Sequence, residues 1–239
     1  MKKTILIILV LSLFLSSAIV AQEGGYSYIK ETKWGINKNT SGGLIGGLII
    51  KQSIAIDDRM FHTFGIEVMN ITHPNENGQR AFDTGAFYKL AKQNYFYSIR
   101  AQYGRDLILF KKAPQQGAQV IAMLAAGPSF GIQSPYFLNV NNENVKYDPT
   151  ESTHRDLGSI SGSGKLFQGI GESKIILGAN VKAGVSFEFG VFKNSVTGFE
   201  AGFLIDAYTR NVLIMDDNNA INKSIFPTSF ITVFWGSRK

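Results

Sequence analysis

The chain between Lys174 and Tyr208 alternates apolar and polar residues with very few breaks. In its first half the odd positions are apolar, whereas the even positions include Lys182 and Glu188. A short turn at Lys193–Ser195 follows, and the alternation then resumes. Because successive side chains of a strand point to opposite faces, this pattern predicts two strands with one apolar face each. The other face mixes small and charged residues, which is typical of the interior of a transmembrane barrel.

The same pattern predicts eight strands long enough to cross a bilayer, since a tilted transmembrane strand needs about 9–11 residues. The predicted strands are Tyr26–Ile36, Gly43–Ile54, Met60–Ile71, Asn94–Phe110, Gly117–Ser134, Lys174–Phe192, Val196–Thr209 and Ile225–Ser237. The first of them depends on its aromatic residues and on the even number that places both termini on one side. Short turns such as Asp57–Arg59 alternate with long loops such as Pro135–Ser173. The predicted fold class is all-β: an antiparallel up-and-down transmembrane β-barrel of eight strands, with long external loops, short periplasmic turns and both termini periplasmic.

The alternation also assigns each side chain to a face. The lipid face is expected to hold Phe64, Ile66, Val68, Tyr95, Tyr97, Ile99, Ala101, Val120, Ala122, Leu124, Ala126 and the odd series from Ile175 to Val191. An interfacial girdle is expected at Tyr95, Tyr97, Tyr103, Phe192 and Trp235. A soluble β-sandwich core is the alternative for these aromatic residues.

A polar network is expected inside the barrel. Its members are Glu67, Arg100, Gln102, Lys182, Glu188, Glu200 and Asp206, joined by Lys51, Thr63, Ser98, Asn180 and Ser186. Both signs of charge are present, so pairing offsets the cost of burial. Since the interior of an eight-stranded barrel is just wide enough for its own side chains, the sequence predicts a filled lumen without a diffusion pore.

The first 21 residues have the features of a signal peptide. Met1–Lys3 is basic, Ile5–Leu15 is apolar, and small residues precede the expected cleavage after Ala21. The predicted organisation is a signal peptide at 1–21 and a single outer-membrane barrel domain at 22–239. An anchor helix is the weaker alternative, because a helical span needs about 20 apolar residues.

Charge and cysteine content do not change the predicted fold. The formal net charge is +6, about +4 without Lys2 and Lys3, and no basic run occurs. Nucleic-acid binding is therefore not supported. There is no cysteine, which fits a fold that needs no disulfide.

Candidate catalytic chemistry is sparse. His154 lies among Asp148, Glu151 and Asp156, but in a loop, and the His-x-Ser pair of lipid-deacylase barrels is missing. The same acidic cluster matches no calcium loop. Gly162–Lys165 resembles the end of a phosphate loop, yet Leu166 follows where Ser or Thr is required. No catalytic residue, metal site or cofactor is predicted, and the glycine-rich stretch 158–171 is interpreted as an external loop.

Several segments carry a family resemblance. They are Trp34–Gly43, Tyr103–Arg105, Ser186–Gly190 and Phe234–Arg238, together with Ala21-Gln22. With them the chain resembles an uncharacterised family of Bacteroidota-type outer-membrane β-barrel proteins. The resemblance implies location and fold and brings no site residues. Such barrels often end in an aromatic residue that the insertion machinery recognises, whereas here Gly236–Lys239 follows Trp235, so the whole last strand is expected to be the signal.

The function predicted is that of a non-enzymatic outer-membrane β-barrel with a filled lumen. Its role is structural or accessory, and one version makes it a subunit of an outer-membrane assembly or secretion complex. The expected partners are outer-membrane lipid, the barrel insertion machinery and such a complex, and no nucleic acid. The alternatives are an outer-leaflet lipid-modifying enzyme that uses His154 or His73, and a narrow small-solute transporter lined by Arg100, Lys182, Glu188 and Glu200.

Overall fold

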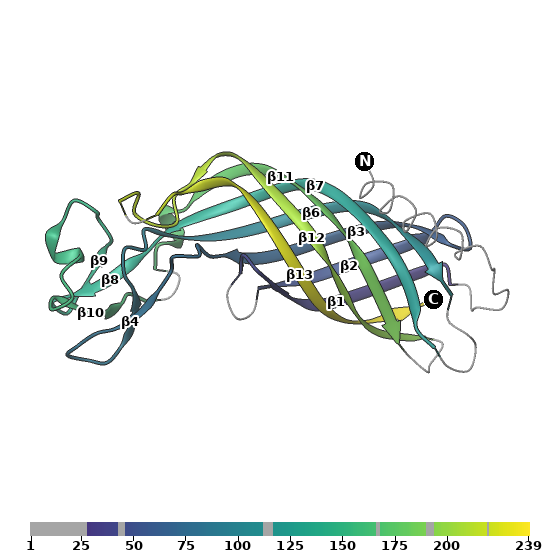
Figure 1. Cartoon of the computed structure of the whole chain (residues 1–239), viewed down its shortest axis with the longest axis horizontal. Coiled ribbons are helices and arrows are strands. Elements are labelled where there is room, and N and C mark those ends of the chain that lie inside the picture. Colours follow the sequence, from purple (N-terminus) through teal and green to yellow (C-terminus); the bar gives the residue numbers. More distant parts are fainter. Residues whose placement is uncertain (1–27, 43–45, 112–116, 166–167, 190–193, 219) are drawn as a thin grey trace, which may run out of the picture.

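Eight antiparallel strands close into a barrel in the computed structural model, which describes residues 28–42, 46–111, 117–165, 168–189, 194–218 and 220–239 (Figure 1). The strands are β1 (Lys30–Asn39), β2 (Gly47–Ala55), β3 (Met60–Ile71), β6 (Asn94–Phe110), β7 (Gln119–Pro135), β11 (Lys174–Phe189), β12 (Ser195–Val212) and β13 (Lys223–Arg238). Neighbours in the sequence are neighbours in the barrel, and β1 pairs with β13 to close it, with Trp34 opposite Trp235. Closure leaves no strand edge with unpaired backbone groups.

The stagger of the strands follows from the register of each neighbouring pair. One circuit perpendicular to the strands passes from Lys30 through Ile54, His62, Arg105, Leu124, Ala183, Phe203 and Ser229. It returns to β1 at Thr40, whose N–H donates to the Ser229 carbonyl, ten residues further along the strand than Lys30. A closed barrel with such a stagger has strands tilted by about 35–45° and an interior that side chains can fill.

The predicted fold class is confirmed, and the bounds of β3 and β6 agree with the prediction. The first strand begins later and runs further than predicted, from Lys30 to Asn39, and β12 extends to Val212. Residues 1–27, which include the expected signal peptide, lie outside the described residues. The loop between β3 and β6 contains a short hairpin, in which β5 (Phe87–Lys89) pairs with β4 (Gly78–Arg80).

The long loops form an ordered extension beyond one end of the barrel, opposite the end where the C-terminus lies (Figure 1). It holds the β4–β5 hairpin and a three-stranded sheet of β8 (Phe137–Val140), β9 (Glu143–Lys146) and β10 (Ile160–Ser163), in the order β10-β8-β9. Two short 3-10 helices, Ser152–His154 and Ile170–Glu172, complete it. Its own buried cluster is Ala81, Tyr88, Tyr136, Leu138, Val140, Tyr147 and Ile160. The described residues include no helix long and apolar enough to span a membrane.

The two faces of the barrel wall differ sharply in chemistry. The outer face exposes large apolar side chains, among them Leu48, Ile50, Phe64, Ile66, Val68, Leu124, Phe130, Ile175, Leu177, Val181, Phe203, Ile205, Ile231 and Val233. Trp34 and Trp235 lie 5.2 Å apart, ring to ring, towards the end with the short turns, and Tyr95 and Tyr97 lie towards the loop end. Tyr103 sits in the middle of β6 and not near its end, and Phe192 and Val191 lie outside the described residues.

Candidate functional site

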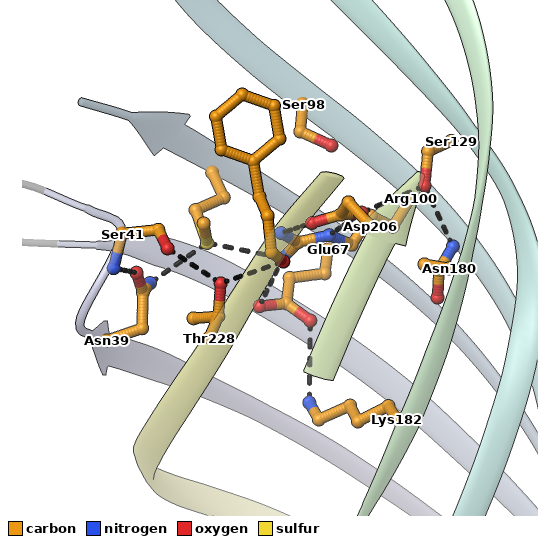
Figure 2. A network of polar contacts seen from close by, with 12 residues as sticks. Asn39, Ser41, Glu67, Ser98, Arg100, Ser129, Asn180, Lys182, Asp206 and Thr228 are labelled. Atoms are coloured by element: carbon orange, nitrogen blue, oxygen red, sulfur yellow. Dashed lines mark hydrogen bonds and ion pairs between the residues drawn. The ribbon is translucent and has the colours of Figure 1, made fainter. Parts of the chain in front are cut away.

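The lumen contains two clusters of paired charges, and the first centres on Arg100 of β6 (Figure 2). Its guanidinium donates two hydrogen bonds to Asp206 of β12, one of them from Nε to Oδ1 at 2.9 Å. It also lies 3.2 Å from Oε1 of Glu67 on β3. Glu67 is the register partner of Arg100 on the neighbouring strand β3, whereas Asp206 lies on β12, three strands away from β6, and all three side chains are almost fully buried. They therefore span the lumen and tie its walls together.

Further polar side chains complete this first cluster. Lys182 lies 3.4 Å from the second oxygen of Glu67, and Asn37 donates to its first oxygen at 2.7 Å. Ser129 donates to Asp206 at 3.1 Å. With two acids and two bases among Glu67, Arg100, Lys182 and Asp206, the cluster is neutral, which is the condition under which buried charge is tolerated.

The Asn180 side chain donates hydrogen bonds at a point where the ladder between β6 and β7 is interrupted. In the β6–β7 ladder Arg100 pairs with Ser129 and Tyr103 pairs with Ala126, but the two residues between them are not paired. Opposite this gap, Asn180 donates to the carbonyls of Gly127 and Pro128 at 3.0 and 3.2 Å, and Gln102 donates to Asn180 at 2.8 Å. Proline has no N–H to offer the ladder. The lumen amides thus supply hydrogen bonds where the ladder loses them.

The second cluster fills the end of the lumen near the short turns. Lys33 pairs with Glu31 at 2.8 Å and with Glu188. Arg238 of the last strand bridges Glu31, at 2.6 Å, and the same Glu188. Next to them Lys51 lies 3.0 Å from both Asp106 and Glu200. The salt bridges link β1, β11 and β13, so charge pairing reinforces the closing seam.

All seven residues of the expected polar network are buried in the lumen, but they do not form one group. Glu67, Arg100, Lys182 and Asp206 share the first cluster, and Gln102 adjoins it through Asn180, whereas Glu188 and Glu200 belong to the second. The prediction missed Glu31, Lys33, Asp106 and Arg238. The signal for the first two was present, because Trp34 and Ile36 face outward and alternation then turns Glu31 and Lys33 inward.

The loop end of the lumen is closed by apolar side chains. We call residues 213–218 and 220–222, the described part of the connection between β12 and β13, the mouth segment. Its Ile214, Met215 and Ala220 form a buried cluster with wall residues Met69, Ile71, Phe96, Ile176, Tyr208 and Val212 and with Ala91. Gln93 and Asn94 donate their backbone N–H groups to the Ile214 carbonyl at 2.9 and 3.1 Å. The mouth segment is therefore hydrogen-bonded in place over the lumen.

Two residues of the loop extension, Tyr147 and Arg155, contact the mouth segment from the other side. Asp216 accepts hydrogen bonds from the Tyr147 hydroxyl at 3.2 Å and from the Arg155 guanidinium at 2.6 Å. Burial opposes ionisation of Asp216, but the backbone N–H of Asn218 and the Arg155 guanidinium outweigh it and hold the pKa of Asp216 below its ordinary value. Within the lumen, a cavity of about 10 Å³ lies among Lys51, Thr63, Asp106 and Lys182, about the volume one water needs.

The histidines sit in structural contacts. His154 is buried, and its Nδ1 accepts the backbone N–H of Asp148 at 2.9 Å. His73 accepts from the N–H of Asn75 at 3.1 Å, and His62 contacts the Tyr103 hydroxyl at 2.7 Å. At none of these three rings do the described residues show the serine, histidine and carboxylate relay of a hydrolase. Among the residues that the structure describes there is also no group of metal-ligating side chains.

No protein-family model matches the sequence, and no curated protein matches it. Among solved structures, the chain is similar to Ail, the attachment invasion locus protein of Yersinia pestis, at 8% identity and a TM-score of 0.43, covering 90% of this chain and 100% of that one. Ail in complex with the heparin analogue sucrose octasulfate gives 9% and 0.41 with the same coverage. Neisserial surface protein A gives 12% and 0.39, covering 91% of this chain and all of that one. The fold described above follows from the strand registers and does not depend on these likenesses.

Proposed function

We propose that this protein is an outer-membrane β-barrel that conducts no solute and serves as a rigid base for its ordered external loops, through which it contacts a partner. The short turns and both termini of the chain face the periplasm in this proposal. The role is accessory and non-enzymatic, and membership of an outer-membrane assembly or secretion complex is its sharper form. The observation that carries the proposal is a lumen whose charges are paired across its width and whose mouth is closed.

The outer face supports placement in a membrane. Large apolar side chains point outward from every wall strand, while the charged residues of the wall point mainly inward. In water such a surface would be an aggregation hazard, whereas in lipid it is the surface that a barrel needs. The sequence resemblance to Bacteroidota-type outer-membrane barrels supports the same location.

The external extension supports a role in contact. Its sheet has a buried core of its own, and Phe82 and Phe87 on the β4–β5 hairpin are 81% and 61% exposed. Exposed aromatic side chains on an ordered scaffold are typical anchors of protein interfaces. Loops that only sealed the barrel would not need a buried core of their own.

Conductance tests the sealed lumen. Purified protein reconstituted in planar bilayers is expected to give no stable single-channel current. A large, reproducible conductance would refute the sealed lumen, because it would require a continuous aqueous path through both charged clusters.

Orientation has a direct test because the chain contains no cysteine. Asn77→Cys lies in an external loop and Asp58→Cys in a short turn, and both positions are exposed. A membrane-impermeant maleimide on intact cells is expected to label the first and to label the second only after the outer membrane is opened. The reverse result would invert the proposed topology.

To identify the partner, the protein is extracted from outer membranes in mild detergent and purified through a tag placed after Lys239. A stoichiometric companion that is lost on Phe82→Ala with Phe87→Ala supports contact through the extension. The matched control is Phe203→Ala, an equally exposed phenylalanine on the barrel wall. Recovery of the barrel alone would remove the accessory role and leave a self-contained one.

A further inference from the structure

A pocket of about 200 Å³ lies on the outer surface of the barrel, at the loop end of β3, β6 and β7. Its floor includes Val68, Ile99 and Ile132, and its upper wall is formed by Gly164, Lys165, Gln168, Gly169 and Ile170. The glycine-rich sequence that contains Lys165 therefore has a place in the fold that its resemblance to a phosphate loop did not reveal. The pocket is separate from the lumen clusters, because its floor is the opposite face of the wall.

The pocket opens towards lipid. Val68, Ile99 and Ile132 belong to the outward-facing positions of their strands, next to the exposed Ile175 that pairs with Ile132. Tyr95 and Tyr97 add two nearly parallel rings, 6.2 Å apart. Tyrosine at this depth is typical of the boundary between acyl chains and headgroups.

The upper wall is held in place by close packing. Gly164 donates its N–H to the Phe137 carbonyl at 2.7 Å, and a Cβ at that position would lie 2.6 Å from the Cβ of Phe137. A Cβ on Gly169 would lie 2.6 Å from the Pro135 carbonyl oxygen. Glycine at both positions lets the segment lie directly on β7 and β8, so the pocket has a fixed wall on its external side.

A positive charge lies at this rim. Lys165 lines the pocket and is exposed. No ion pair with Lys165 is found among the residues that the structure describes. Lys146 differs, because Glu172 neutralises it at 3.0 Å. Lys174 does not contribute, because alternation along β11 places it on the lumen side with its register partner Gln133.

We propose that this pocket binds one acyl chain of a phosphate-bearing lipid of the outer leaflet and that Lys165 binds the phosphate of its headgroup. The apolar floor supplies the contact with the chain, and Lys165 supplies a charge-assisted hydrogen bond. The inference depends on the proposed membrane location and adds a lipid class to it.

The test uses the full-length protein in detergent, titrated with a bisphosphorylated lipid A and followed by native mass spectrometry. The variant Lys165→Gln is expected to weaken binding by roughly tenfold or more, the loss of one charge-assisted hydrogen bond. The matched control is Lys223→Gln. It lies on β13, which is opposite β6 in the strand order, so binding should not change.

Two further arms separate the pocket from general surface charge. Chemically dephosphorylated lipid A should bind parent and Lys165→Gln equally and weakly. Ile99→Trp, which fills the floor from the lipid side, should weaken binding of both lipids. Equal binding of the phosphorylated lipid to parent and Lys165→Gln would overturn the headgroup contact, and an unchanged affinity in Ile99→Trp would overturn the pocket.

Insertion into lipid vesicles, scored by protection from protease, distinguishes this inference from the proposed function. A protein that inserts but shows no preference for the phosphorylated lipid refutes the inference alone. A protein that does not insert refutes the membrane location, and the inference with it.

Discussion

Removing Arg100 should destabilise the barrel more than any exposed charge change. In Arg100→Met the side-chain volume is largely kept, but Asp206 loses two hydrogen bonds and retains only the one from Ser129 at 3.1 Å. Glu67 loses a contact of 3.2 Å and keeps those with Lys182 and Asn37. Breaking a buried ion pair from one side costs about 3–5 kcal/mol, because the other charge stays buried without compensation.

Urea unfolding in lipid vesicles, followed by the fluorescence of the two tryptophans, measures this loss. Trp34 and Trp235 face each other across the β1–β13 seam, so their signal reports on closure of the barrel. Linear extrapolation gives the free energy of unfolding for parent and variant, provided that the slope is unchanged.

The matched control is Arg105→Met, the same replacement five residues along the same strand on an exposed position. It should not lower the free energy of unfolding by more than about 0.5 kcal/mol, because Arg105 points to the outer face, where lipid accommodates methionine at least as well as arginine. Arg100→Met combined with Asp206→Leu should recover much of the loss, because the stranded carboxylate is gone. If Arg100→Met folds and stays within about 1 kcal/mol of the parent, then water reaches these charges and the filled lumen is wrong.

Other changes test other parts of the molecule. Asn180→Leu should lower the free energy of unfolding by about 1–3 kcal/mol in the same assay, since it removes the side-chain donor to the Gly127 and Pro128 carbonyls. An unchanged stability would show that these two hydrogen bonds do not stabilise the interrupted ladder. Asp216→Asn should make the external extension more sensitive to protease while barrel stability stays constant; equal digestion of both proteins would contradict the proposed contact. Burial opposes ionisation of Glu76, but Lys92 and Lys89 outweigh it and lower the pKa of Glu76 below the ordinary 4.5. The stabilising contribution of this carboxylate is therefore complete above about pH 4.5 and is lost as pH falls through the folded pKa. Hydrogen exchange of the β4–β5 hairpin should accordingly become faster in acid. Deletion of Ser229–Lys239 removes most of the strand that closes the barrel and should abolish outer-membrane assembly, whereas correct insertion of the truncated chain would contradict this.

The sequence by itself determined the wall of the barrel. Alternation with a period of two follows directly from strand geometry, so β3 and β6 were predicted to the residue and every residue assigned to the lumen is buried. The weakest prediction, the first strand, was the one where alternation is short, and the inward Glu31 and Lys33 were missed with it.

Only the tertiary structure decided which charges meet and how the loops fold. Arg100 and Asp206 are 106 residues apart, and their pairing depends on the stagger of the strands, which no local pattern encodes. The short strands of the external sheet are too brief to show a period, and their order follows from burial of Tyr136, Leu138 and Ile160 against one another. The lipid pocket likewise arises where a glycine-rich loop settles on strands distant in sequence, because close approach of backbones depends on three-dimensional packing and not on neighbouring residues.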